Sequence, residues 1–221
     1  ILVNWFAVKQ ALEGMHDVDY LPYEAYVDLC QQRSVADQVS QRALLELLHQ
    51  LGVVLCYQED PRLQDTNILN PEWVTNGVYT ILNANLLFQQ RGILERRQLQ
   101  EILDPVRYPA AKHSFLIDLM RKFELCFDLD GHLDQKFLVP DLLYWEDLDT
   151  GHWVDALPFR YDYDVLPGSI MTRFIVKMHP YIHQHTCWRT GVVLAHEGNR
   201  ALVKGDIEDR CIYIWVDGPI H

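Results

Sequence analysis

Residues 65–79 read Asp-Thr-Asn-Ile-Leu-Asn-Pro-Glu-Trp-Val-Thr-Asn-Gly-Val-Tyr, and they predict the start of a helix. Asn70 is a preferred N-cap residue, Pro71 fits the first helical position, and Glu72 places a negative charge in the first turn. We interpret Trp73 as a core residue, because tryptophan is highly buried on average. Apolar residues then recur at helical spacing, at Val74, Val78, Ile81 and Leu82.

The chain before this stretch predicts a winged-helix-like unit. Apolar periodicity and capping residues favour helices near residues 4–15, 23–30 and 44–51, followed by a strand at 53–57, a turn at 59–62 and a short returning strand at 68–69. A second unit of similar order is expected after it. Its elements are a short helix at 96–103, a longer helix at 110–123 and strands at 124–129 and 136–139.

The pattern changes after an acidic, irregular stretch at residues 141–156. Beyond it, apolar and polar residues alternate at 157–163, a helix is expected up to Met178, and three strands follow at 190–195, 201–204 and 211–216. The sequence therefore predicts an α+β fold. A winged-helix-like domain would occupy residues 1–150, and an antiparallel sheet of order β-α-β-β-β would occupy residues 151–221.

Composition narrows the class of partner. The chain has 221 residues, 49% of them hydrophobic, and a net charge of −12, which disfavours contact with nucleic acid or an anionic membrane. Its five cysteines are irregularly spaced, which favours a reducing, cytoplasmic location. Because the chain starts at Ile1 and runs directly into a helical pattern, we expect a fragment of a longer protein.

Signatures of catalysis are missing from the sequence. It has no phosphate-binding Gly-x-x-x-x-Gly-Lys-Ser/Thr loop and no Gly-x-Ser-x-Gly elbow. The histidines between His179 and His185, with Cys187, are the best metal candidates, but no second cluster supports them. We predict no enzyme activity, no cofactor and no catalytic or metal-binding residue in this chain; a metal-dependent hydrolase stays as a weak alternative.

Nucleic-acid binding is the second alternative, because a winged helix can place one helix in the major groove. The corresponding helix here, residues 41–51, offers only Arg42 and His49 to phosphates. With so few basic residues on this helix, the sequence favours a winged helix that contacts protein over one that binds nucleic acid. Four residues combine the side-chain types that dominate protein interfaces, and we predict them as partner contacts, with burial in the core as the alternative: Tyr161, Tyr163, Trp188 and Arg189.

Several apolar blocks, taken in order, make the chain resemble the COR domain that follows the Ras-like GTPase of Roco proteins, in its bacterial form. The blocks are Leu51-Gly-Val-Val-Leu55, Leu69-Asn-Pro-Glu-Trp-Val74, Leu103-Asp-Pro-Val-Arg-Tyr-Pro109, Phe123-Glu-Leu-Cys-Phe127 and Cys187-Trp-Arg-Thr-Gly191. The resemblance implies a COR-A part that packs on the GTPase domain of the same polypeptide and a COR-B part that carries homodimerisation. It implies a non-catalytic regulatory module that couples nucleotide state to dimerisation. It also implies that COR-B continues into a helix beyond His221.

Overall fold

The computed structural model describes residues 2–146 and 148–219. The chain forms two compact units. Unit 1 contains residues up to 81 together with 103–119, and unit 2 contains residues 82–102 together with 120 onward. Helices and antiparallel sheets occur together, which confirms the predicted α+β class.

Unit 1 is mainly helical. Its elements are α1 (Leu2–Glu13), β1 (Tyr20–Pro22), α2 (Tyr23–Gln32), α3 (Gln38–Gln50), β2 (Thr66–Ile68), α4 (Pro71–Leu82) and most of α7 (Ala110–Lys122). The first three helices enclose one apolar cluster, because each presents a stripe of buried residues to the others. Its most buried members are Val8, Tyr26, Cys30, Leu44, Leu45 and Leu48.

The start of α4 is as predicted. Asn70 Oδ1 accepts a hydrogen bond from the Glu72 backbone N–H at 3.1 Å, so Asn70 caps the helix, and Pro71 occupies its first position. Trp73 is fully buried, as expected of a core residue.

The strand expected at 53–57 is reduced to a single bridge between Leu55 and Ile68. Residues 66–68 pair instead with β1, with Leu21 opposite Asn67. A three-residue strand is too short for alternation to reveal it, which is why β1 escaped the sequence pattern. The winged-helix interpretation of unit 1 stays a prediction.

Unit 2 combines a small and a large sheet. Its elements are α5 (Asn85–Gln89), β3 (Ile93–Glu95), η1 (Arg96–Gln98), α6 (Leu99–Ile102), β4 (Phe127–Asp128), β5 (Lys136–Leu138), η2 (Pro140–Leu142), β6 (Leu157–Asp162), α8 (Ile170–Met178), η3 (His179–Tyr181), β7 (Ile182–Trp188), β8 (Gly191–His196), β9 (Asn199–Asp206) and β10 (Cys211–Asp217). The small sheet has the order β3-β5-β4. The β4 and β5 strands lie within the segments predicted for them, whereas β3 was not predicted.

The large sheet corrects the predicted strand order. It has five antiparallel strands in the order β6-β10-β9-β8-β7, so the connectivity is β-α-β-β-β-β and not β-α-β-β-β. The unpredicted strand is β7. Its Gln184 and His185 have left-handed backbones, with φ of 48° and 58°, and the register with β8 shifts between Ile182 and Cys187. This bulge breaks the alternation by which a strand is recognised.

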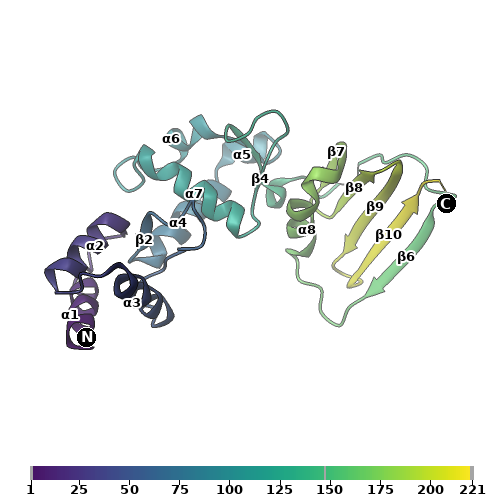
Figure 1. Ribbon diagram of the computed structural model, residues 1–221. Coiled ribbons are helices and arrows are strands. Elements are labelled where there is room, and N and C mark those ends of the chain that lie inside the picture. The colour runs from purple at the N-terminus through teal and green to yellow at the C-terminus, as the bar shows by residue number, and fades with distance from the viewer. Residues whose placement is uncertain (1, 147, 220–221) are drawn as a thin grey trace. The chain divides into compact units, whose positions relative to one another are not determined.

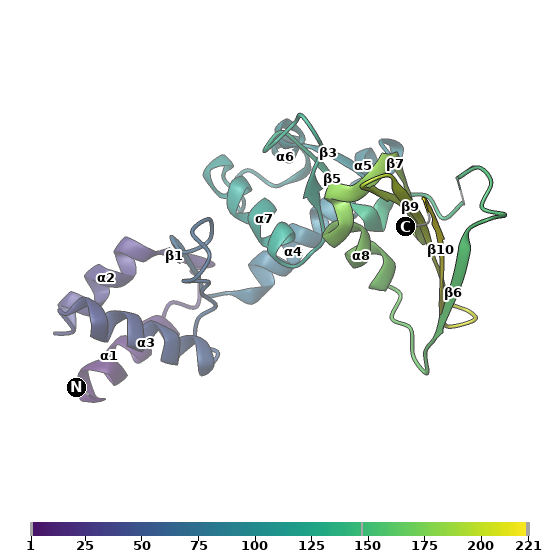
Figure 2. The same ribbon diagram turned by 45° about the vertical axis from the view of Figure 1, so that its right-hand side comes forward.

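Helix α8 covers one face of the large sheet near β7, β8 and β9 (Figures 1 and 2). Met171 and Ile175 of α8 pack with Val192 and Val203 of the sheet in one buried cluster. Gly205 on β9 permits this approach, because a Cβ atom there would lie 2.5 Å from Met171 Cγ. Phe127 and Leu138 of the small sheet join the same cluster, so this part of the core connects the two sheets of unit 2.

Candidate protein interaction surface

An apolar surface lies on β6 and β10, on the sheet face that carries α8. Three pairs of residues stand directly opposite each other in the ladder: Tyr161 and Ile212, Phe159 and Ile214, and Leu157 and Val216. Opposite residues in an antiparallel pair share one face of the sheet. We call these six residues the β6–β10 surface.

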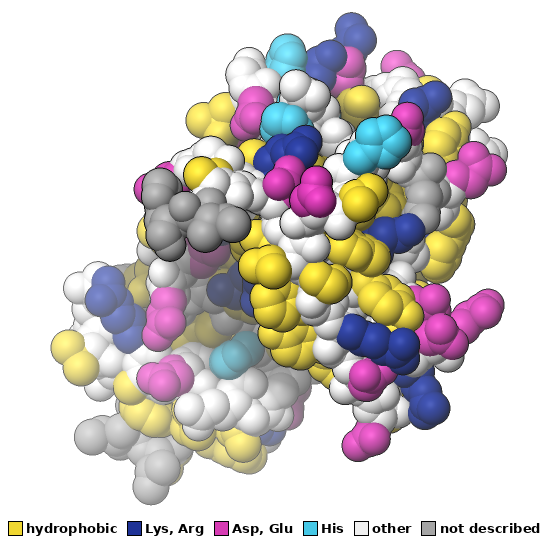
Figure 3. All heavy atoms as spheres, turned by 90° about the vertical axis from the view of Figure 1, so that its right-hand side faces the viewer, with side chains coloured by type: hydrophobic (Ala, Val, Ile, Leu, Met, Phe, Trp, Pro, Cys, Tyr) yellow, Lys and Arg dark blue, Asp and Glu magenta, His cyan; other side chains and the backbone are white. Residues whose placement is uncertain are grey.

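The β6–β10 surface is open to solvent because α8 does not extend over it. The β6 side chains on this face are 65% (Leu157), 48% (Phe159) and 53% (Tyr161) exposed, and their β10 partners are half-buried. Figure 3 shows hydrophobic side chains gathered in a band on this side of the molecule. Large apolar side chains that adjoin one another at a surface mark sites of association more often than scattered ones do.

A shallow apolar groove continues this face toward β8. It has a volume of about 220 Å³, and Leu194, Ala201 and Val216 lie along it. The ladder places Leu194 opposite Ala201, and Ala201 opposite Val216. The groove and the β6–β10 surface therefore meet at Val216.

The other face of β6 is polar. Arg160 donates a hydrogen bond from Nε to Asp162 Oδ1 at 2.8 Å, and its guanidinium lies 5.4 Å from the Tyr213 ring centroid. Polar and apolar residues thus alternate along β6, and only one face of the strand is suited to association.

The four predicted contact residues do not form one surface. Tyr161 lies on the β6–β10 surface, and Tyr163 follows β6, where its backbone N–H bonds the Arg210 carbonyl. Trp188, by contrast, is only 1% exposed and packs with Val193 and Leu202, so its indole lies in the core.

Arg189 is engaged within its own unit. Its backbone N–H donates to the Tyr144 carbonyl at 2.9 Å, and its guanidinium lies 4.5 Å from the Trp145 ring centroid. Sequence reasoning missed Leu157, Phe159 and the β10 residues as a surface. The alternation of apolar and polar residues at 157–163 could have identified Leu157 and Phe159, because it shows that β6 has an apolar face. It does not show whether a helix covers that face.

Other kinds of site find little support. Among residues 2–146 and 148–219, no group of three or more His, Cys, Asp or Glu could hold a metal ion. His179 is instead stacked on Phe127, with ring centroids 4.7 Å apart. His49, expected to face phosphates in the nucleic-acid alternative, has its Nδ1 within 3.3 Å of the Val54 carbonyl oxygen.

Comparison with known proteins decides the family. The family model described as "C-terminal of Roc, COR-A domain" matches residues 3–143, and the one described as "C-terminal of Roc, COR-B domain" matches residues 154–221. The chain belongs to the COR domain family. This confirms the resemblance to Roco proteins, and neither matching model describes an enzyme family.

Relatives of this COR chain occur in prokaryotes and in an amoeba. A "Roc-COR-CHAT protease" from an unknown prokaryotic organism is 25% identical over 227 residues, covering 97% of this chain and 20% of that protein. The "Probable serine/threonine-protein kinase pats1" of Dictyostelium discoideum is 23% identical over 193 residues, covering 80% of this chain and 6% of that protein. The COR chain thus spans a fifth or less of the length of these two relatives.

A solved structure supports the COR fold. The structure of Methanosarcina barkeri Roco2 RocCORdC bound to GDP matches with a TM-score of 0.59 and 39% sequence identity, covering 63% of this chain and 43% of that one. No helix in the described part of the COR chain is long and apolar enough to cross a membrane.

Proposed function

We propose that this COR chain is a non-catalytic dimerisation and regulatory module of a Roco protein. The β6–β10 surface carries the proposal, because it is apolar, contiguous and uncovered by α8. Its occupant would be the same surface of a second copy. Such an isologous contact buries two apolar faces at once, and a two-fold axis closes the assembly at a dimer.

The contact would be made by the face of β6 and not by its free edge. Pro158 has no backbone N–H to offer a further strand, and Arg160 and Asp162 place charges along that edge. These features hinder the pairing of β6 with another strand. They do not hinder the packing of the exposed Phe159 and Tyr161 side chains against a second copy.

The partner in the same polypeptide would be the Ras-like GTPase domain. In support, the relatives' names place Roc beside COR, and the solved Roco2 RocCORdC is bound to GDP. In this proposal, residues 1–150 act as COR-A and pack on the GTPase domain, and residues 151–221 act as COR-B and dimerise. The nucleotide state can be coupled to dimerisation only if the dimer affinity differs between the two states. We place the parent protein in the cytoplasm, which the five free, buried cysteines favour, and the module itself needs no cofactor.

The test uses the parent protein with its GTPase domain, in light-scattering measurements over a range of concentrations, with GDP and with a non-hydrolysable GTP analogue. The variant Phe159→Gln/Tyr161→Gln removes apolar surface without changing charge. Central aromatic contacts of an interface contribute about 2 kcal/mol or more, so we expect the dimer dissociation constant to rise by about thirtyfold.

The matched control is Arg160→Gln/Asp162→Asn, which changes the other face of the same strand and leaves the net charge unaltered. Pro158, which also hinders strand pairing, is unchanged, so this variant should dimerise like the unmodified protein. Equal dimerisation of the two variants would overturn the assignment of the surface. An equal dissociation constant in both nucleotide states would overturn the proposed coupling alone.

A further inference from the structure

A cavity of about 480 Å³ lies within unit 2, between the small sheet and β7, away from the β6–β10 surface. Its volume is within the range of about 300–1,000 Å³ that is typical of pockets for small molecules. Residues far apart in the sequence meet there, including Ile93 of β3, Leu138 of β5 and Cys187 of β7.

The floor of the cavity is apolar. Phe127, Leu138 and Cys187 are buried, and Leu143 and Ile182 are half-buried beside them. Burial raises the pKa of the Cys187 thiol to about 11, so the thiol stays neutral and behaves as part of the apolar wall. A ligand therefore needs an apolar body to fill this cavity.

The polar groups of the cavity are mostly basic, although the chain as a whole carries a charge of −12. Arg91, Lys136 and three histidines line it, against a single carboxylate, Asp130. Lys136 is already paired with Glu95 at 3.0 Å. Arg91 lies over the Tyr144 ring at 5.2 Å and has no ion pair with a described residue, so its charge is available to a ligand.

Two of the histidines are held in place by the fold. His179 Nδ1 lies 2.8 Å from the Val176 carbonyl oxygen, which can only accept, so Nδ1 must donate and Nε2 is left for another partner. His185 belongs to the β7 bulge, where the six residues from Ile182 to Cys187 lie opposite only three of β8, from Val192 to Leu194. Bulges of this kind redirect side chains and are frequent beside functional sites.

We propose that this cavity binds a small organic anion, with its carboxylate near Arg91 and its apolar body against Phe127, Leu138 and Cys187. The sign of the charge follows from Arg91, which lies at the cavity in an otherwise acidic chain. The need for an apolar body follows from the buried floor. This site is separate from the proposed dimer surface, so binding here does not depend on that proposal.

The test is isothermal titration of the full chain with octanoate, and with 1-octanol as a neutral probe with the same chain length. We expect one saturable octanoate site and at least about tenfold weaker binding of octanol, because a charge-assisted hydrogen bond contributes about a factor of ten or more. Octanoate that fails to saturate, or octanol that binds equally well, would overturn the proposal.

Two variants locate the site. Arg91→Gln should weaken octanoate binding by about tenfold and leave octanol binding unchanged. Leu143→Trp, which places a larger side chain at the half-buried wall, should abolish binding of both probes. The control Arg42→Gln makes the same charge change on α3 of unit 1 and should bind octanoate normally. Because Arg91 is exposed, its variant tests the proposal even if Leu143→Trp does not fold, and undiminished binding by Arg91→Gln would contradict it.

Discussion

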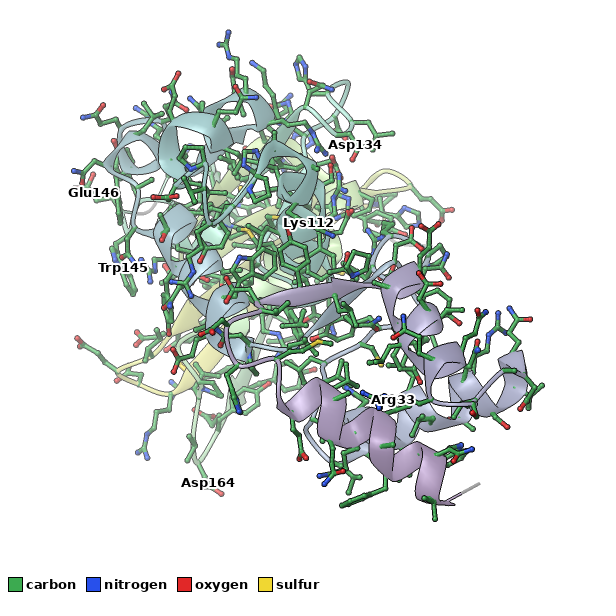
Figure 4. The ribbon with its side chains drawn as sticks, turned by 90° about the vertical axis from the view of Figure 1, so that its left-hand side faces the viewer. Arg33, Lys112, Asp134, Trp145, Glu146 and Asp164 are labelled. Carbon is green, nitrogen blue, oxygen red and sulfur yellow. The ribbon has the colours of Figure 1, made fainter. Side chains whose placement is uncertain are left out.

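The Tyr108 hydroxyl donates a hydrogen bond to the Trp73 carbonyl oxygen at 2.9 Å, and the two rings stack with their centroids 5.4 Å apart. Trp73 Nε1 in turn donates to the Arg107 carbonyl oxygen at 2.9 Å. Two hydrogen bonds in opposite directions therefore join the first turn of α4 to the segment before α7. Tyr20 and Phe115 complete an aromatic cluster around Trp73, and the ammonium group of Lys112, a residue labelled in Figure 4, lies 4.4 Å from the Tyr20 ring centroid.

Trp73→Ala should lower the free energy of unfolding of unit 1 by about 3–5 kcal/mol, because it leaves a cavity and removes the part-buried hydrogen bond to the Arg107 carbonyl. Trp73→Phe keeps an aromatic ring but loses ring volume at a fully buried site and the part-buried hydrogen bond to the Arg107 carbonyl, and should cost about 1–3 kcal/mol. Urea unfolding followed by circular dichroism measures both. Trp145→Ala serves as the control, since Trp145 is 58% exposed, and should cost about 1 kcal/mol or less. A Trp73→Ala loss no larger than this control would show that the cluster is not a stability centre.

Gly77→Ala should also destabilise unit 1, although alanine favours helices. A Cβ atom at position 77 would lie 2.8 Å from Tyr108 Cε1 and 3.3 Å from both Leu116 methyl carbons, in a fully packed core. Overpacking costs about 1–3 kcal/mol, and the gain in helix propensity of about 1 kcal/mol offsets only part of it. Thermal unfolding of Gly77→Ala is compared with that of Asn76→Ala, a substitution at an exposed position of the same helix. The comparison separates the cost of overpacking from the change in helix propensity. Asn76→Ala should be neutral or slightly stabilising; equal stabilisation by both variants would mean that the helices can separate without cost.

Glu124 should make part of the stability of unit 2 dependent on pH. Hydrogen bonds from Lys177 and then Arg173 of α8 lower the pKa of its carboxyl below the ordinary 4.5, with contacts of 3.0 Å and 2.6 Å. Because the pKa of Glu124 is lower in the folded state, its carboxylate contributes its full stabilisation of the folded state above pH 4.5. This stabilisation is lost as the pH falls through the folded-state pKa. The difference in unfolding free energy between the unmodified chain and Glu124→Gln should therefore shrink below pH 4.5.

Denaturant unfolding at a series of pH values measures this difference. Glu208→Gln is the control, because Glu208 is exposed and makes no ion pair with a described residue. Its effect should be small at every pH. The Glu124 effect should also decrease in high salt, since exposed ion pairs are screened. A Glu124→Gln effect that did not change with pH would exclude a role for the carboxylate charge.

Local signals in the sequence were enough to predict elements that have a capping residue or an unbroken apolar period. Asn70 and Pro71 mark the start of α4 through hydrogen bonding and a preset φ, which act within one turn. The helix predicted over residues 110–123 and the strands β6, β9 and β10 were found from apolar periodicity and from the turns between the strands, because the period of apolar residues reports which face is buried. The α+β class followed from these elements, whereas the resemblance to the COR family was carried by the apolar sequence blocks and their order.

Pairing and burial were decided by the tertiary structure. The short strands β1 and β3 exist only because a distant strand completes their hydrogen bonds, and β7 is hidden by a bulge at Gln184 and His185. Trp188 and Tyr161 are both large aromatic residues on strands, yet Trp188 is buried and Tyr161 exposed. That difference depends on what covers each face of the sheet. A pattern of alternation shows that a strand has an apolar face, but only the packing of α8 determines which part of that face remains open.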